Sequence, residues 1–429
     1  MLDLQLIRTQ TAYVTEALAR KGHAVDFGPF LEKDRLRREA IFEVESLKAE
    51  KNRVSAEIPK RKKAGQDVTE TLAAMKRLSD GIAEKDAAVA RMDTEQKDFL
   101  DRLPNLPADD VVAGGKENNR VVRSWGEKPA FGFAPKHHVD LVESLGIIDY
   151  ARGAKLGGSG FWIYRGDGAR IEWALLSYFM EEHLKDGYEF LLPPHILTEA
   201  CGYTAGQFPK FKDDVFQLRG EDAEGGALRF ILPTAETALV NLHRDEILDE
   251  ILLPLRYFAY TPCYRKEAGS YRAEERGMVR GHQFNKIEMF QYTRPEDSDA
   301  ALEELVGKAE RLMQGLGLHH RVSKLAAGDC SDAMRKTYDI EVWIPSMDDY
   351  KEVSSASNAG DYQARRGSLR FRRRETGKPE FLHTLNASGL ATSRILPAIV
   401  EQFQQADGSV VIPEVLRKWM GGQERLRPR

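Results

Sequence analysis

Charged and aromatic residues recur at short intervals in residues 263–290, which read CYRKEAGSYRAEERGMVRGHQFNKIEMF. Apolar ends around a charged, glycine-bearing middle predict two antiparallel strands joined by a long loop. Arg265 and Glu267 are two apart, so on a strand they share one face. A guanidinium can clamp a phosphate through two hydrogen bonds, and a carboxylate can accept from an exocyclic amine or an ammonium group. Phe284 offers a plane on which a base can stack, and Glu288 offers a second carboxylate. Arg-x-Glu alone is more typical of a salt-bridged hairpin, so the nucleotide hypothesis depends on the whole run.

Three further segments carry polar residues that could bind a ligand, and each lies next to an apolar run. Thr234-Ala235-Glu236 follows FILP, and its hydroxyl and carboxylate can hold a small ammonium group, although the tripeptide alone is typical of a helix N-cap with a first-turn acid. Glu352-Val353-Ser354-Ser355 lies on a strand-like run, where a carboxylate with a hydroxyl can bind Mg²⁺ held on ATP phosphates. The alternative for that run is a solvated edge strand.

The third segment is LNASGLATSR, residues 385–394, which precedes an apolar helix. The pattern predicts a strand, a turn of small residues and then Arg394 at the start of a helix. A guanidinium beside a helix N-terminus suits a terminal phosphate.

Residues 31–103 differ in composition from the rest of the chain, being rich in Lys, Arg, Glu, Asp and Ala. Their apolar and small residues recur at steps of four and three, which predicts two long helices with a heptad seam. Pro59, Gly65 and Asp67 lie at the break, so the helices fold back on each other as an antiparallel hairpin. The cluster Lys60, Arg61, Lys62 and Lys63 at the tip favours an anionic partner. A dimerisation coiled coil or a spacer is the alternative.

These segments together resemble the class II aminoacyl-tRNA synthetases, and in detail the seryl-tRNA synthetases. GHQFNKIEMF is similar to the seryl form of motif 2, residues 385–394 resemble motif 3, and SNAGDYQARR and DGSVVIPEVLRKWMG resemble further family segments. The N-terminal hairpin resembles the tRNA-binding arm of the family. The resemblance runs from residue 1 to about residue 420. One loop departs from it: AGSYRAEERG has Glu274 and Glu275 where Asp-Thr is usual.

The resemblance implies roles for individual residues. Arg265 and Arg394 are the implied catalytic residues, and Glu352 with Ser355 would hold Mg²⁺. The implied serine-binding residues are Thr234, Ala235, Glu236, Arg265, Glu288, Asn386 and Ser388. The implied ATP-binding residues are Arg265, Lys266, Glu267, Phe284, Glu352, Val353, Ser354, Ser355 and Arg394. Lys60, Arg61, Lys62 and Lys63 would contact tRNA.

Composition limits the class of protein. The 429 residues carry a formal net charge of −4, so any RNA contact must come from a local basic patch. The N-terminus has no apolar signal segment, and no apolar run is long enough for a membrane span. Three widely spaced cysteines predict a reduced, cytoplasmic protein.

The mixed pattern of short strands and helices predicts an α+β fold. We expect an antiparallel sheet flanked by helices, with an N-terminal antiparallel two-helix coiled-coil arm. The expected domains are an N-terminal tRNA-binding domain at 1–106, a linker at 107–130 and a class II catalytic domain at 131–429. The strand YEFLLPPHIL carries two prolines, which exclude a central paired position. With the long helix at 170–186 before it, this strand resembles motif 1, which implies a homodimer.

The sequence therefore predicts an enzyme that activates serine with ATP and transfers it to tRNA(Ser), and by the same resemblance to tRNA(Sec). Two alternatives stay open. A class II paralogue loading a small amino acid on a non-tRNA acceptor would lack the arm, and a non-catalytic RNA-binding scaffold would lose site residues.

Overall fold

The computed structural model describes residues 1–218, 228–267 and 277–429. The altered loop at Tyr271–Glu275 therefore lies outside the described residues. The chain forms two compact units. One comprises Leu2–Ala19 and His23–Leu103, and the other comprises Met1, Arg20–Gly22 and Pro104–Arg429. None of the described helices is both long enough and apolar enough to cross a membrane.

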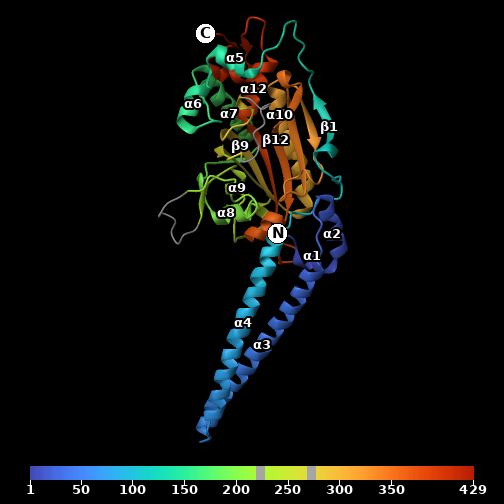
Figure 1. Cartoon of the computed structure of the whole chain (residues 1–429), viewed down its shortest axis with the longest axis vertical. Coiled ribbons are helices and arrows are strands. Elements are labelled where there is room, and N and C mark those ends of the chain that lie inside the picture. Colours follow the sequence, from blue (N-terminus) through green and yellow to red (C-terminus); the bar gives the residue numbers. More distant parts are fainter. Residues whose placement is uncertain (219–227, 268–276) are drawn as a thin grey trace. The chain divides into compact units, whose positions relative to one another are not determined.

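The smaller unit contains the predicted hairpin. After α1 (Leu4–Thr9) and α2 (Thr11–Arg20), α3 runs from Gly28 to Lys63 and α4 from Thr69 to Asp101, so the antiparallel pair is confirmed (Figure 1). At 1.5 Å per residue each helix is roughly 50 Å long. Val44 and Ile82 are buried along the seam. Ion pairs such as Lys48–Asp86, at 2.8 Å, join the two helices at the surface.

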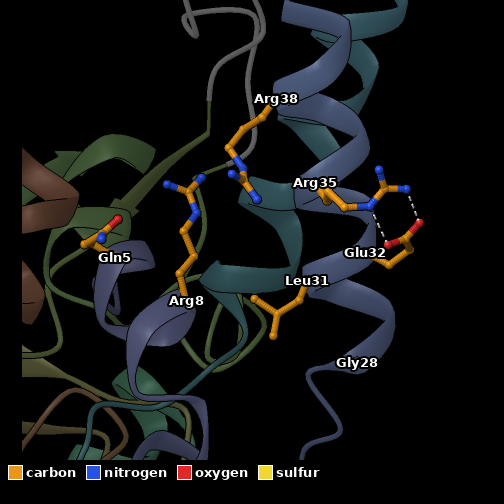
Figure 2. Close-up of a pocket in the computed structure, with 7 residues that line it drawn as sticks. All are labelled: Gln5, Arg8, Gly28, Leu31, Glu32, Arg35 and Arg38. Atoms are coloured by element: carbon orange, nitrogen blue, oxygen red, sulfur yellow. Dashed lines mark hydrogen bonds and ion pairs between the residues drawn. The ribbon is translucent and has the colours of Figure 1, made fainter.

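Asp34 joins α1, α3 and α4 near the base of the hairpin. Its carboxylate accepts from Arg8 at 2.7 and 2.8 Å and from Gln96 at 2.9 Å, and Arg38 lies 3.3 Å away. The Asp34 side chain is only 1% exposed, and the hydrogen bond from Arg8 lowers the pKa of its carboxyl. Figure 2 shows the cleft beside this contact, where Arg35 turns away to Glu32. The arginines of this cleft are thus engaged with acids of the same unit.

The larger unit is built on an eight-stranded sheet, which confirms the α+β prediction. Every neighbouring pair is antiparallel except β4 and β8, which are parallel. Strand β4 lies at one edge of the sheet, and the two prolines, Pro193 and Pro194, follow it. The order is β1 (Arg120–Trp125), β10 (His320–Lys324), β11 (Lys336–Ile344), β12 (Asp349–Gly360), β15 (His383–Ala391), β9 (Gln283–Thr293), β8 (Leu255–Tyr264) and β4 (Glu189–Leu191).

Part of the predicted linker at 107–130 is structured. Residues Arg120–Trp125 form β1, which pairs with β10 at the other edge of the main sheet. The sequence did not predict this strand, because all six residues of β1 are exposed and a strand without a buried face has no alternating hydrophobic pattern.

Helices cover one face of the sheet and leave part of the other face for polar residues. The main core joins this face to α5 (His138–Leu145), α7 (Asp167–Lys185), α10 (Ser298–Gly315) and α12 (Thr392–Gln402). On β9 the core residues are Ile287 and Met289, so Lys286 and Glu288 point to the opposite face. The same alternation on β15 puts Leu385 and Ala387 in the core and turns Asn386 and Ser388 the other way.

Shorter elements complete the larger unit. They are β2 (Ile148–Asp149), α6 (Tyr150–Gly157), β3 (Ile163–Tyr164), β5 (Ile196–Thr198), α8 (Glu199–Thr204), β6 (Arg229–Ile231), α9 (Glu236–Leu239), β7 (Ile247–Asp249), α11 (Tyr362–Gly367), β13 (Arg370–Arg372), β14 (Pro379–Phe381), β16 (Val410–Val411) and β17 (Arg425–Leu426).

Candidate active site

A cavity of about 510 Å³ opens on the polar side of β9, β12 and β15. Most of the predicted serine and metal residues line it, although they come from distant parts of the chain. The predicted residues in its wall are Thr234, Glu236, Arg265, Glu267, Glu288, Glu352, Ser355, Asn386 and Ser388.

Hydrogen bonds hold the polar groups at the floor of this cavity. Ser388 on β15 lies directly opposite Glu288 on β9 in the strand register. The Asn386 amide donates to Glu288 at 3.0 Å and to Glu236 at 3.5 Å. Gln363 donates to the other oxygen of Glu236 at 2.8 Å. Two carboxylates are thereby fixed on either side of one amide.

Lys286 is a cavity residue that the sequence prediction missed. Its ammonium group donates to the Thr234 hydroxyl at 2.7 Å and forms an ion pair with Glu288. Lys286 and Glu288 are 5% and 0% exposed, so this pair is buried. The signal was present in the sequence, because Phe284, Lys286 and Glu288 follow each other at steps of two and must share one face of a strand.

Glu236 carries a perturbed carboxyl. Burial raises its pKa to about 7, and the nearby charge of Glu288 adds to the effect, whereas Gln363 and Lys286 act in the opposite direction. Thr234 and Glu236 lie at the start of α9, with the Glu236 amide 3.3 Å from the Thr234 hydroxyl. A cation that entered beside Glu236 would favour the ionised carboxyl.

A second, smaller cavity of about 80 Å³ adjoins the first. The Arg265 guanidinium lies 5.2 Å from the ring centroid of Phe284, within the range of a cation–π contact. Glu267 forms an ion pair with Arg280 at 2.6 Å. This wall also contains Glu352, Val353 and Arg394.

Arg265 and Glu267 do not lie on a strand, and that prediction is wrong. Strand β8 ends at Tyr264, and Glu267 has a positive φ of 48°. The chain turns out of the sheet there, because the hairpin loop begins at this point. Both side chains still reach the cavity walls.

A bulge in β12 brings Glu352 and Ser355 to the same face. Ser354 pairs with Ile340 on β11 whereas Glu352 pairs with the next residue, Glu341, so Val353 is the extra residue. Without the bulge, residues three apart would point to opposite faces. Strand β12 lies inside the sheet, which excludes the alternative of a solvated edge strand.

Asp339 on β11 is a second residue that sequence reasoning missed. It lies opposite Ser355 in the register, and its Oδ1 atom is buried without a hydrogen-bond partner among the described residues. Glu352, Ser355 and Asp339 together offer the hard oxygen ligands that Mg²⁺ prefers.

Arg394 is the third residue of α12, where it donates to the carbonyl oxygens of Val279 at 3.1 Å and Glu352 at 2.6 Å. The predicted turn of small residues before it is absent. Strand β15 runs to Ala391, and α12 begins at Thr392 without a separate turn. Three of the small residues, Ser388, Ala391 and Ser393, instead line the smaller cavity.

Some predicted residues are not in the cavity walls. Ala235 is buried, Ser354 donates to the carbonyl of Ser388 at 2.6 Å, and Lys266 donates to the carbonyl of Asp213 at 2.9 Å. The predicted tRNA-binding residues Lys60–Lys63 form the last turn of α3 in the other unit.

The fold and this site define a class II aminoacyl-tRNA synthetase. Residues 221–403 match the model of the tRNA synthetase class II core domain (G, H, P, S and T), and residues 1–107 match the seryl-tRNA synthetase N-terminal domain. The chain belongs to the seryl-tRNA synthetase family, and it is an aminoacyl-tRNA ligase.

Relatives cover the whole chain. It is 65% identical to serine--tRNA ligase 2 of Clostridium acetobutylicum, over 98% of this chain and 99% of that protein. It is 46% identical to serine--tRNA ligase of Nitratidesulfovibrio vulgaris, over 99% of this chain and 100% of that protein. The solved seryl-tRNA synthetase of Pyrococcus horikoshii complexed with ATP has a TM-score of 0.91 at 35% identity, with both chains covered completely.

Proposed function

We propose that the larger cavity binds serine and that its carboxylate is activated there by ATP. Glu236 and Thr234 receive the ammonium group of serine, and Glu288 and Ser388 bind its hydroxyl, with Asn386 holding both carboxylates. The observation that carries the proposal is the juxtaposition of Glu288 and Ser388 across β9 and β15, linked through Asn386 to Glu236. Ala235, between Thr234 and Glu236, is buried behind the cavity wall.

The smaller cavity and its rim suit ATP. Phe284 stacks on the adenine, and Glu267 accepts a hydrogen bond from its amino group. Lys266, Val353 and Ser354 border the nucleotide through their backbone. Arg265 lies between the two cavities and bridges the serine carboxylate and the α-phosphate. Arg394 holds the γ-phosphate. The serine carboxylate attacks the α-phosphorus in line, and pyrophosphate leaves, so positioning and charge stabilisation carry the reaction.

Mg²⁺ fits the oxygen-rich corner of the cavity. Glu352 and Ser355 would hold it, and the unpaired buried oxygen of Asp339 supports a cation nearby. When bound, Mg²⁺ would neutralise charge on the ATP phosphates. The contact between Arg394 and the Glu352 carbonyl places the guanidinium beside the same corner.

In the second step the terminal ribose hydroxyl of tRNA(Ser) attacks the seryl carbonyl, and a phosphate oxygen of the adenylate takes the proton. We assign tRNA binding to the hairpin, whose last α3 turn carries Lys60, Arg61, Lys62 and Lys63. The family resemblance extends the acceptor to tRNA(Sec). The three free cysteines support the cytoplasm as the compartment.

Charging of purified tRNA tests the proposal. Labelled serine should become attached to tRNA(Ser) only when ATP, Mg²⁺ and the protein are all present. Attachment of serine to an acceptor other than tRNA, with tRNA(Ser) left uncharged, would favour the paralogue alternative instead.

Serine binding should weaken as the pH falls through about 7. Above this pH the Glu236 carboxyl is ionised and can pair with the ammonium group, whereas below it the carboxyl is protonated, because burial and Glu288 raise its pKa to about 7. The KM for serine should rise roughly tenfold between about pH 8 and pH 6, as expected for one titrating group. The KM for ATP is the internal control. Glu236→Gln should give a high serine KM without this pH dependence, and an unchanged pH dependence in that variant would contradict the assignment.

We also propose a homodimer through α7 and β4. Both segments expose large apolar side chains: Trp173 on α7 is 56% exposed, and Leu192, just beyond β4, is 72% exposed. Exposed apolar side chains of this size are typical of an interaction surface. Trp173→Lys should shift the mass measured by light scattering from dimer to monomer, and Phe42→Lys on α3, where the aromatic ring is 72% exposed, should not. A monomeric wild-type chain would contradict the proposal.

A further inference from the structure

Glu172 is a buried carboxyl that the reaction scheme does not use. It lies in the first turns of α7 and is 3% exposed. A carboxyl in such a position costs free energy unless hydrogen bonds compensate for the lost water. The positions of its hydrogen-bond donors therefore indicate what the residue does.

Two side chains donate to the same oxygen of Glu172. The Asn285 amide, on β9, donates to Oε1 at 2.7 Å, and the Thr392 hydroxyl, at the start of α12, donates to Oε1 at 2.6 Å. Thr392 also lies 3.2 Å from the carbonyl oxygen of Asn285. Tyr260 on β8 donates to the Asn285 side-chain oxygen at 3.1 Å. One carboxyl thus joins α7 to β9 and α12, and through Asn285 to β8.

The two donors lie within two residues of the residues assigned to ATP. Asn285 follows Phe284, which is assigned to the adenine, and Thr392 is two residues before Arg394, which is assigned to the γ-phosphate. Because the carboxyl binds both donors through one oxygen, it holds the beginning of β9 and the beginning of α12 at a fixed separation. Adenine and γ-phosphate are the two ends of the nucleotide, so this separation must match the length of ATP.

The Glu172 carboxyl can keep its two hydrogen bonds whether it is ionised or protonated. Burial raises the pKa of Glu172 to about 7. Its second oxygen and the Tyr164 hydroxyl on β3 are both buried, and the interaction with Tyr164 acts against the rise in the pKa of Glu172. A protonated carboxyl, or an amide of the same shape, keeps the accepting oxygen and adds a donor on the other side. A glutamine can therefore replace the group, whereas an apolar residue of similar size cannot.

We propose that Glu172 is a positioning residue for ATP, which sets the separation between Phe284 and Arg394 without touching the nucleotide. The inference rests on the proposed function, since that assigns those two residues to ATP. The serine pocket has its own support in the contacts of Asn386 and Gln363, so Glu172 should affect one substrate and not the other.

The test is a comparison of Glu172→Leu and Glu172→Gln in the full-length chain by serine-dependent ATP–pyrophosphate exchange. Leucine leaves both donors unpaired, so the KM for ATP should rise about tenfold or more, as for loss of two buried hydrogen bonds. The KM for serine should stay within about twofold of wild type. Glutamine should restore the KM for ATP to near the wild-type value.

Thr392→Val is the second variant, in case Glu172→Leu does not fold. It removes one donor with little change in shape and should raise the KM for ATP by a smaller factor, again with the KM for serine unchanged. Glu310→Gln is the control, since Glu310 is a buried acid paired with Arg123 at 2.8 Å, and it lines neither cavity.

Three outcomes would overturn the inference. They are an unchanged KM for ATP in both Glu172→Leu and Thr392→Val, an equal rise in the KM values of both substrates, and a failure of glutamine to restore ATP binding. Wild-type protein without serine-dependent exchange would instead refute the proposed function, so the two failures are distinguishable.

Discussion

Arg265→Lys should reduce serine-dependent ATP–pyrophosphate exchange by roughly 10²-fold or more, the effect of losing one preorganised donor to a developing charge. Lysine keeps the positive charge but loses the planar fork, which can bind a carboxylate and a phosphate together. It also loses the flat surface that lies 5.2 Å from the Phe284 ring. The loss should therefore appear in the rate of adenylate formation.

The matched control for this substitution is Arg256→Lys. Arg256 is on strand β8, which ends one residue before Arg265; it forms an ion pair with Glu304 at 3.3 Å and lines neither cavity. It should retain near wild-type exchange. Arg265 would be a structural residue if its lysine variant activated serine as fast as the control, or if the variant lost its fold together with its activity.

Replacing residues 35–100 by a short Gly/Ser link should separate the two activities of the enzyme. Exchange should stay near the wild-type rate, because the cavity residues all belong to the larger unit. Charging of tRNA should collapse, because the phosphate contacts assigned to the hairpin are gone. Both activities can be measured on one preparation.

The design of this variant follows from the structure. Residues 20–22 belong to the larger unit, where the Lys21 ammonium donates to the carbonyl oxygens of Ser331 and Met334 at 2.9 Å each. Ser331 and Met334 line the larger cavity. The link must therefore leave residues 1–34 in place, since loss of Lys21 would disturb the cavity itself.

A milder change tests the basic tip alone. Neutralising Lys60, Arg61, Lys62 and Lys63 together should weaken tRNA binding and reduce its salt dependence, while exchange is unchanged. Normal tRNA charging by the protein without residues 35–100 would show that the hairpin is a spacer or an assembly element.

The sequence predicted the elements with strong periodicity. The heptad seam of 31–103 predicted α3 and α4, since a regular apolar stripe on each side of the break fits few structures other than two paired helices. The prolines after β4 predicted its edge position. The candidate site was predicted through motifs, and most of those residues do meet in the larger cavity although they are distant in the chain.

Local backbone geometry was the part that the sequence did not reveal. The bulge at Val353 reverses the side-chain alternation within β12, and no residue type requires it there. The exit of Arg265 and Glu267 from β8 depends on where pairing with β9 stops. Asp339 was missed because it comes from a neighbouring strand, so only the register places it opposite Ser355. Lys286, in contrast, could have been found from its alternation with Glu288.

The most direct measurement for the assignment of this site is ATP–pyrophosphate exchange by the wild-type protein with serine, alanine and threonine in parallel. Glu288 and Ser388 are the buried polar groups assigned to the substrate hydroxyl, and alanine would leave those hydrogen bonds unmade. The account predicts that serine drives exchange more efficiently than alanine by a factor of up to about 10⁴, with threonine rejected because of its extra methyl group. Exchange with alanine at a rate comparable to that with serine would contradict it.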